Sequence, residues 1–369
     1  MRKIKILHAA DLHLDSPFEG LPEGKAAQRR QEQRELLGKI AEIVQTQEIQ
    51  LVLLSGDLLD SDSAYAETGE ELLSALRTMS VPVFIAPGNH DCYTAGSPYA
   101  KLDFPGNVHI FRRNEMECVE LPELGVRVWG AAFTDKYSAG LLEGFCAEKA
   151  EDTLDVMCIH GDVNPASRYN PITEEQIAAS NMNYIALGHT HLESGLRKSG
   201  KTYYAWPGCP EGRGFDETGD KHIYIVGIVD DETRIMPVSV AGRRYEILPV
   251  ELEGREPMTA IDEVINDDTS RDIYRIILRG ETEEAPDISN LRIALESRFY
   301  SLQLRDETHL VKDIWEKAGE DSLRGIFLAK LKEAYNKAYN ETEREKIMQA
   351  VRWGLAALDK REEVIRHDD

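Results

Sequence analysis

Five short apolar segments of this chain each end in a polar motif, and this pattern constrains the fold more than any other feature. The segments cover residues 4–10, 51–55, 81–86, 154–159 and 184–187, and their composition is typical of buried strands. The motifs are Asp11-Leu12-His13, Gly56-Asp57, Gly88-Asn89-His90-Asp91, His160-Gly161-Asp162 and Gly188-His189-Thr190-His191. Strands of an open α/β sheet end at one shared edge, so the motifs are expected to meet there.

The remaining patterns divide the chain in two. Further strands are predicted at 126–132, 202–206, 222–230 and 234–240, and amphipathic helices around 36–44 and over 67–79. Residues 1–240 are therefore expected to form one layered α/β domain. Residues 241–369 are expected to form a smaller second region, with a strand at 274–278 and helices from 288 onward.

Two helices are predicted near the C-terminus. Apolar residues recur at helical spacing over 326–338 and 347–358, and Thr342 and Glu345 are in capping-box register. Both packing within their own domain and docking of a partner helix are compatible with these apolar faces.

The chemistry of the motifs favours metal binding. Alternate residues of an extended backbone point the same way, so Asp-x-His and His-x-His can each supply two ligands to one ion or one ligand to each of two. Carboxylate, imidazole and amide donors suit Mn²⁺, Fe²⁺ or Zn²⁺. Any single motif has a structural explanation, but five in this order predict a site for two ions.

The series of motifs over residues 11–191 resembles the signature of the calcineurin-like metallophosphoesterase superfamily. The resemblance implies a four-layer αββα sandwich, followed by a smaller α+β capping domain with C-terminal helices. It implies two divalent ions, most often Mn²⁺, that together stabilise the displacement at phosphorus and supply a water nucleophile. The implied ligands are Asp11, His13, Asp57 and His191 for one ion, and Asp57, Asn89, His160 and His189 for the other.

The same resemblance assigns catalytic roles to two residues. His90 would face the substrate phosphate and help to protonate the leaving oxygen, which imidazole can do near neutral pH. Asp60 matches the position that orients this histidine in many relatives. The alternative for Asp60 is a turn or helix-cap residue.

Three features favour the SbcD-like DNA repair exonuclease branch with its YhaO-type bacterial members. Residues 10–18 look like the N-terminal stretch of those members, residues 206–213 resemble their Pro-Gly-x-x-x-Gly-Arg segment, and an additional domain follows the catalytic one. The resemblance implies a DNA exonuclease or endonuclease, a coiled-coil ATPase partner of the SbcC type and a homodimer formed by the catalytic domains. Arg213, Arg168 and Tyr93 are candidate phosphate contacts, and a solvated surface role is an equal alternative for each.

Other functions remain open at this point. A small-molecule phosphodiesterase, acting on cyclic nucleotides or nucleotide-sugar diphosphates, would use the same ligands. A protein Ser/Thr phosphatase is disfavoured because Asp91 stands where that class has glutamate. A scaffold without catalysis is disfavoured by the complete ligand set.

Composition limits how this chain can bind nucleic acid and in which compartment it is expected. With 43 Lys and Arg against 66 Asp and Glu, the net charge of −23 argues against a protein that coats nucleic acid by charge alone, but it does not exclude a local binding site. Bound divalent ions would reverse the sign of the field locally. No apolar run is long enough for a membrane helix, and the five cysteines are scattered along the chain. We therefore expect a cytoplasmic protein whose cysteines are reduced thiols.

Overall fold

The computed structural model describes residues 2–61, 63–150, 152–265, 268–282, 284–310 and 315–358. The chain divides into two compact units. The first contains Met1–Ile247 with the short segments Ser270–Tyr274 and Phe299–Ser301, and the second contains the rest.

Two six-stranded sheets build the first unit. One has the order β12-β11-β1-β2-β3-β4, with β1 to β4 parallel and β11 and β12 antiparallel. Its strands are β1 (Lys3–Ala9), β2 (Leu51–Leu54), β3 (Val83–Ile85), β4 (Val108–Ile110), β11 (His222–Val229) and β12 (Glu232–Ser239).

The other sheet has the order β5-β6-β7-β8-β10-β9, and its four inner strands are parallel. Its strands are β5 (Glu117–Leu121), β6 (Val126–Gly130), β7 (Leu154–His160), β8 (Tyr184–Gly188), β9 (Arg197–Ser199) and β10 (Thr202–Ala205). The strands β4, β5 and β9 were not anticipated from the sequence, because they are short and only partly buried.

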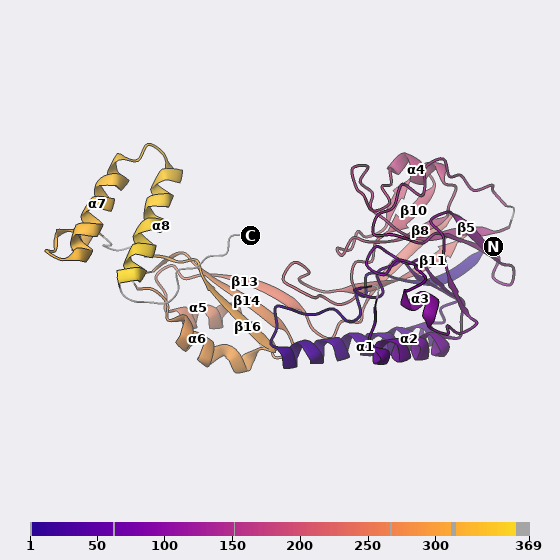
Figure 1. Cartoon of the computed structure of the whole chain (residues 1–369), viewed down its shortest axis with the longest axis horizontal. Coiled ribbons are helices and arrows are strands. Elements are labelled where there is room, and N and C mark those ends of the chain that lie inside the picture. The colour runs from indigo at the N-terminus through magenta and orange to yellow at the C-terminus, as the bar shows by residue number, and fades with distance from the viewer. Residues whose placement is uncertain are drawn as a thin grey trace. The chain divides into compact units, whose positions relative to one another are not determined.

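Three apolar layers hold this unit together. The helices α1 (Glu23–Thr46) and α2 (Ala66–Met79) lie side by side, and they share a core with residues of the first sheet such as Leu7 and Val52 (Figure 1). The opposite face of that sheet, with Ile6 and Leu53, packs against the second sheet. The helix α4 (Glu174–Ala179) covers the outer face of the second sheet. Alternate residues of each strand thus face different cores, and the predicted αββα layering is confirmed.

Small elements make up the C-terminal part. A three-stranded sheet has the order β13-β14-β16, and among the described residues four α-helices lie between its strands or after them. The elements are β13 (Tyr245–Glu251), α5 (Pro257–Val264), β14 (Ile273–Arg279), β15 (Glu281–Thr282), α6 (Ile288–Leu295), β16 (Ser301–Asp306), β17 (His309–Leu310), α7 (Leu323–Lys337) and α8 (Glu341–Leu358). The predicted mixture of strands and C-terminal helices is confirmed.

The helices α7 and α8 pack through Leu328, Val351 and Leu355. Gly354 makes this contact close, because a Cβ there would overlap the ring of Phe327. The predicted capping box is wrong: Asn340 caps α8 by accepting from the backbone N–H of Glu343 at 2.9 Å, and so the helix begins before Thr342. Within the described ranges, no helix combines the length and the apolar character needed to cross a membrane.

Candidate metal centre

The motifs lie in loops that follow the carboxyl ends of strands in both sheets, and these loops meet one another. The loops after β1 and β2 run together, since the N–H of Asp11 donates to Gly56 and that of His13 to Asp57. Ser55, at the end of β2, joins the sheets by donating through Oγ to the carbonyl of Ala186 on β8 at 3.0 Å. The ligand candidates therefore come from two sheets, and not from the edge of one open sheet as the motif order alone indicated.

The backbone of these loops is strained. Asp11, His13, Asp57 and His189 all have positive φ angles, of 53°, 43°, 50° and 97°, in a region that non-glycine residues rarely occupy. Such conformations cost about 1–3 kcal/mol each and cluster at functional sites. The surrounding structure must impose them.

Two histidines form the first group of candidate ligands. The Nε2 atoms of His13 and His191 lie 3.1 Å apart, while Nδ1 of His13 is 3.0 Å from Asp60 and Nδ1 of His191 is 2.7 Å from Glu217. A carboxylate accepts a hydrogen bond from each Nδ1–H, and this tautomer leaves both Nε2 lone pairs facing each other. Because metal–nitrogen bonds measure about 2.0–2.1 Å, two nitrogens at this separation fit neighbouring positions around one ion.

Asn89, His160 and His189 form the second group. Oδ1 of Asn89 lies 3.0 Å from Nε2 of His160 and 3.1 Å from Nδ1 of His189. Nδ1 of His160 donates to the carbonyl of Ser55 at 2.9 Å, which leaves its Nε2 free to bind an ion.

Asp57 lies between the two groups. Its Oδ2 is 3.8 Å from Nε2 of His13 and 3.3 Å from Nε2 of His160, while its Oδ1 accepts from the backbone N–H of His90 at 2.9 Å. Gly88 is required beside it, because a Cβ there would overlap this carboxylate. Asp57 is thus placed to serve both groups.

Asp11 completes the cluster. Its carboxylate accepts from the backbone N–H of His189 at 3.0 Å, and Asp11 groups with His13 and His191, and also with Asp57 and His160, at distances that could hold a metal ion. His90 groups in the same way with His13 and Asp57. The residues present therefore fit divalent metals through a mixed nitrogen and oxygen donor set.

The pKa values in this cluster are strongly displaced. Burial raises the pKa of Asp11 to about 6 and lowers that of His13 to about 4. Burial would also lower the pKa of His160, but the carboxylate of Asp57 outweighs it and raises that pKa to about 9. Burial would raise the pKa of Asp57, yet the surrounding imidazoles hold it well below its usual range. Displacements of this kind mark functional sites.

The side chain of Asp60 was expected to orient His90, but it does not contact that imidazole. His90 is exposed beside the cluster, and its Nδ1 lies 3.3 Å from the backbone carbonyl of Asp60. The carboxylate of Asp60 instead contacts Nδ1 of His13 and Nη1 of Arg213, at 3.0 and 3.1 Å. The Asp60 side chain therefore orients His13 and not His90, because Arg213 holds the Asp60 carboxylate next to His13.

Arg213 and Glu217 hold Asp60 and His191 in place, and the sequence motifs did not predict this role. The Arg213 guanidinium donates to Glu217 at 2.6 Å and to Asp60 at 3.1 Å, and lies 3.1 Å from Nδ1 of His191. Arg213 was expected at a substrate phosphate, but its guanidinium is occupied by these groups. Glu217 has no metal-binding spacing to a motif, and only the fold brings it to His191.

The other two candidate phosphate contacts, Tyr93 and Arg168, contact residues outside the two ligand groups. Tyr93 donates its N–H to the carbonyl of Phe133 at 2.7 Å, and its ring packs against the cores and beneath Arg112. Arg168 is exposed, with its guanidinium over the ring of Tyr137. Asp91 has a structural role, since it accepts from the backbone N–H groups of Leu58 and Gly88 and so ties two motif loops together.

Comparison with known proteins agrees with this geometry. The sequence pattern of the family described as "Calcineurin-like phosphoesterase" matches residues 4–207. The chain belongs to this family. Members of the calcineurin-like phosphoesterase family are hydrolases that use divalent metals, and the cluster described above is the corresponding candidate site.

Two curated relatives confirm the predicted resemblance within the family. The chain is 26% identical over 300 residues to "Uncharacterized metallophosphoesterase YhaO" of Bacillus subtilis (strain 168), covering 76% of this chain and 73% of that protein. It is 24% identical over 261 residues to the SbcD subunit of the nuclease SbcCD of the same organism, covering 58% of this chain and 64% of that protein. Among solved structures, the crystal structure of TT1561 of Thermus thermophilus matches with a TM-score of 0.38 and 11% identity, over 63% of this chain and 98% of that one.

Proposed function

We propose that this chain is a dinuclear metal-dependent phosphodiesterase that hydrolyses DNA as an exonuclease or endonuclease. The observation that carries the proposal is the pair of ligand groups that share Asp57, with His90 exposed beside them. Asp11, His13, Asp57 and His191 would hold one ion, and Asp57, Asn89, His160 and His189 the other. Bound Mn²⁺, or Fe²⁺ or Zn²⁺, would stabilise charge on the phosphate and activate water.

The protein's own residues supply the remaining chemistry. His90 can donate a proton to the leaving oxygen, because its ring is exposed and no carboxylate within the described residues holds it. Asp60 and Glu217 keep His13 and His191 in the tautomer that presents Nε2. The similarity to part of a nuclease supports DNA as the substrate.

A direct comparison of substrates tests the proposal. Purified protein with Mn²⁺ should degrade linear DNA in either single- or double-stranded form, and the His90→Gln variant should not. A cyclic nucleotide offered under the same conditions should remain. Consumption of the cyclic nucleotide with intact DNA would replace the nuclease by a small-molecule phosphodiesterase.

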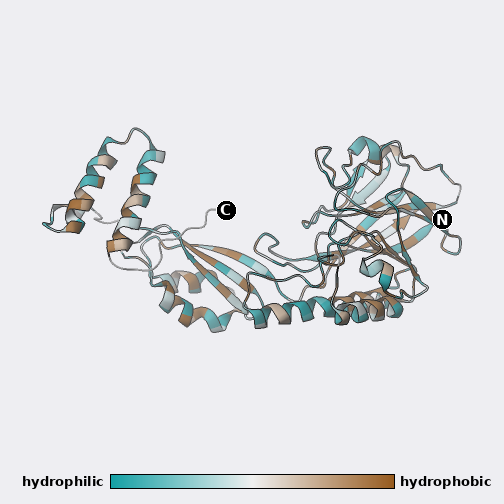
Figure 2. Cartoon of the chain, in the orientation of Figure 1, coloured by the Kyte–Doolittle hydropathy of each residue, from teal (hydrophilic) through white to brown (hydrophobic). Residues whose placement is uncertain are grey.

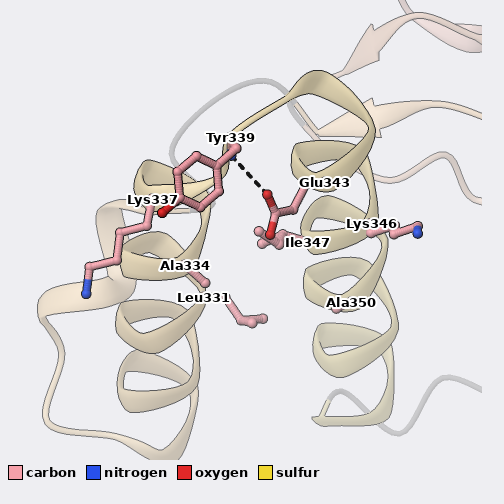
Figure 3. A pocket seen from close by; sticks show the side chains of 8 residues that line it. All are labelled: Leu331, Ala334, Lys337, Tyr339, Glu343, Lys346, Ile347 and Ala350. Atoms are coloured by element: carbon pink, nitrogen blue, oxygen red, sulfur yellow. Dashed lines mark hydrogen bonds between the residues drawn. The ribbon is translucent and has the colours of Figure 1, made fainter.

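The proposal includes a cytoplasmic DNA repair role with a coiled-coil ATPase of the SbcC type and a homodimer of catalytic domains. Side chains on α7 and α8 support an ATPase contact, since Leu323 is 72% exposed, Ile326 53% and Trp353 49%. Figure 2 shows both hydrophobic and hydrophilic segments on each of these helices. Between them, Figure 3 shows a pocket lined by Leu331, Ala334, Lys337, Tyr339, Glu343, Lys346, Ile347 and Ala350.

Co-expression with the ATPase encoded nearest to this chain's gene tests the partnership. The two proteins should co-elute, and Ile326→Glu should separate them without changing the metal content. Light scattering of the isolated chain should give the mass of a dimer.

A further inference from the structure

A row of side chains with neighbouring, mutually tilted rings leads from the metal centre to the surface of the first unit. The ring of Tyr169 lies against that of His189, with centroids 4.8 Å apart and planes inclined by 35°. The ring of Tyr137 follows at 5.5 Å from Tyr169, and the guanidinium carbon of Arg168 lies 3.9 Å from the centroid of Tyr137. Two ring-to-ring steps therefore connect a candidate ligand with an exposed arginine and tyrosine.

The loops that carry this row are fixed to the centre. Asn170 is fully buried; its Nδ2 donates to the carbonyl of His160 at 2.9 Å, and its Oδ1 accepts from the N–H of Leu141 at 2.7 Å. Ser138 pairs with the same segment, since its N–H donates to Arg168 and its carbonyl accepts from Asn170. The position of the row relative to His160 is thus set by hydrogen bonds.

The outer end of the row is available to a ligand. Arg168 is exposed, its guanidinium lies over the ring of Tyr137, and no ion pair with a carboxylate is found for it in the described part of the chain. Tyr137 is 41% exposed, although an aromatic ring gains free energy by burial. In a chain of net charge −23, an arginine without a carboxylate partner beside a catalytic centre favours an anionic ligand.

We propose that Arg168 and Tyr137 form a stacking platform for a nucleobase of the substrate. The inference rests on the proposed phosphodiesterase function. It adds that the phosphodiester substrate carries a nucleobase. Guanidinium and tyrosine planes stack on any base, while the positive charge attracts the adjoining phosphate. A base in a duplex is already stacked and paired, so the platform selects single-stranded or frayed ends near the metal centre.

Kinetics with base-bearing and abasic DNA test the platform. The substrates are a single-stranded thymidine oligonucleotide and the same strand with abasic sugars in its terminal nucleotides. In Tyr137→Leu, which removes the ring but keeps an apolar side chain, KM for the base-bearing strand should rise about 5- to 150-fold, and KM for the abasic strand should not change. Tyr137→Phe should restore the wild-type preference, and Tyr65→Leu, at an exposed tyrosine before α2, is the matched control.

Each outcome has a consequence. An equal loss on both strands, or a lowered metal content in Tyr137→Leu, would show a structural role and overturn the platform. If wild-type protein cleaves methyl p-nitrophenyl phosphate but no DNA, the nuclease assignment fails. The platform is then decided by thymidine 5′-(p-nitrophenyl phosphate): a raised KM in Tyr137→Leu supports it, and an unchanged KM overturns it.

Discussion

Arg213 stands between two carboxylates that each hold one histidine of the metal centre. Its guanidinium donates to Asp60 and Glu217, and these carboxylates contact Nδ1 of His13 and His191. Burial alone would raise the pKa of Glu217, but the imidazole of His191 and the Arg213 guanidinium hold it well below its usual range. Burial also opposes ionisation of the partly exposed Asp60, but His13 and Arg213 lower its pKa. Arg213 thus helps the two imidazoles to keep both acids ionised, and the acids in turn fix two imidazole tautomers.

Glu217→Gln should weaken metal binding without unfolding the protein. The amide keeps the shape of the side chain but loses the charge that accepts from Nδ1 of His191, and such losses lower metal affinity about 10- to 100-fold. Titration calorimetry with Mn²⁺ measures the change. Glu143→Gln, at an exposed loop position, is the control, and equal affinities in the two variants would contradict the orienting role.

His90→Gln separates catalysis from metal binding. The imidazole contributes a proton donor, and its loss should lower kcat about 10²- to 10⁴-fold. The backbone N–H of residue 90, which holds Asp57, is unchanged by the substitution. Metal content measured by emission spectrometry should equal that of wild type; loss of both ions would make His90 a ligand.

At the scale of elements, a buried ion pair ties α1 to the segment that follows β10. Arg29 is fully buried on α1 and pairs with the buried Glu211. Glu211 also accepts from the backbone N–H of Gly242 at 2.8 Å, and Arg29 donates to Glu32. This network anchors the segment that places Arg213 in the centre.

Arg29→Met should destabilise the protein strongly. The substitution leaves the Glu211 carboxylate buried without its cation, which costs about 3–5 kcal/mol of unfolding free energy. Urea denaturation measures it. The double variant Arg29→Met with Glu211→Gln should recover part of the loss, and additive losses would show that the pair is not coupled.

His8 makes the packing of the two sheets sensitive to acid. It lies on β1, fully buried, where Nδ1 accepts from the hydroxyl of Tyr184 at 2.8 Å and Nε2–H donates to the carbonyl of Leu187 at 3.2 Å. Burial lowers the pKa of His8 to about 3 from its ordinary value of 6.5. Between these values the unfolded chain binds a proton that the folded chain does not, so stability falls as the pH falls.

The expected slope is about 1.4 kcal/mol of unfolding free energy per pH unit below about pH 6. His8→Gln removes the titrating group and keeps hydrogen-bonding atoms. The difference in unfolding free energy between wild type and His8→Gln should therefore shrink from pH 7 to pH 5. A constant difference over this range would mean that His8 is already protonated in the folded protein.

At the scale of the whole molecule, the proposed function requires an acidic chain to hold an anionic substrate. The net charge of −23 opposes DNA at long range, whereas two divalent ions bound in the cluster would reverse the field where a phosphate would bind. Arg213 cannot add a phosphate contact, because its guanidinium is engaged within the centre. DNA affinity should accordingly depend on the metals.

Chelation tests this dependence. The slow variant His90→Gln, loaded with Mn²⁺, should bind a fluorescent single strand, and EDTA should weaken binding by roughly ten-fold or more, which equals about 1.4 kcal/mol. The slope of log affinity against log salt should correspond to only about two or three phosphate contacts, near −2. Undiminished binding in EDTA would locate DNA on another surface.

Much of the protein was predictable from residues that lie close together in sequence. Apolar segments of strand length, each followed by Asp, Asn or His, predicted a layered α/β domain and the cluster of candidate ligands from Asp11 to His191, and the family resemblance of these motifs implied the sandwich. Those features are local, because a buried strand and the turn that ends it are encoded within about ten residues. The short, half-buried strands β4, β5 and β9 lacked such a pattern.

Only the tertiary structure decided how the motifs are supported. The meeting of two sheets at Ser55 and Ala186, the contact of Asp60 with His13, the pairing of Glu217 with Arg213 and the row from His189 to Arg168 all join residues far apart in the chain. Their partners are selected by packing and by the need to satisfy buried polar groups, which no local pattern encodes. The sequence alone thus determined which atoms can bind metal, and the fold determined which neighbours orient them.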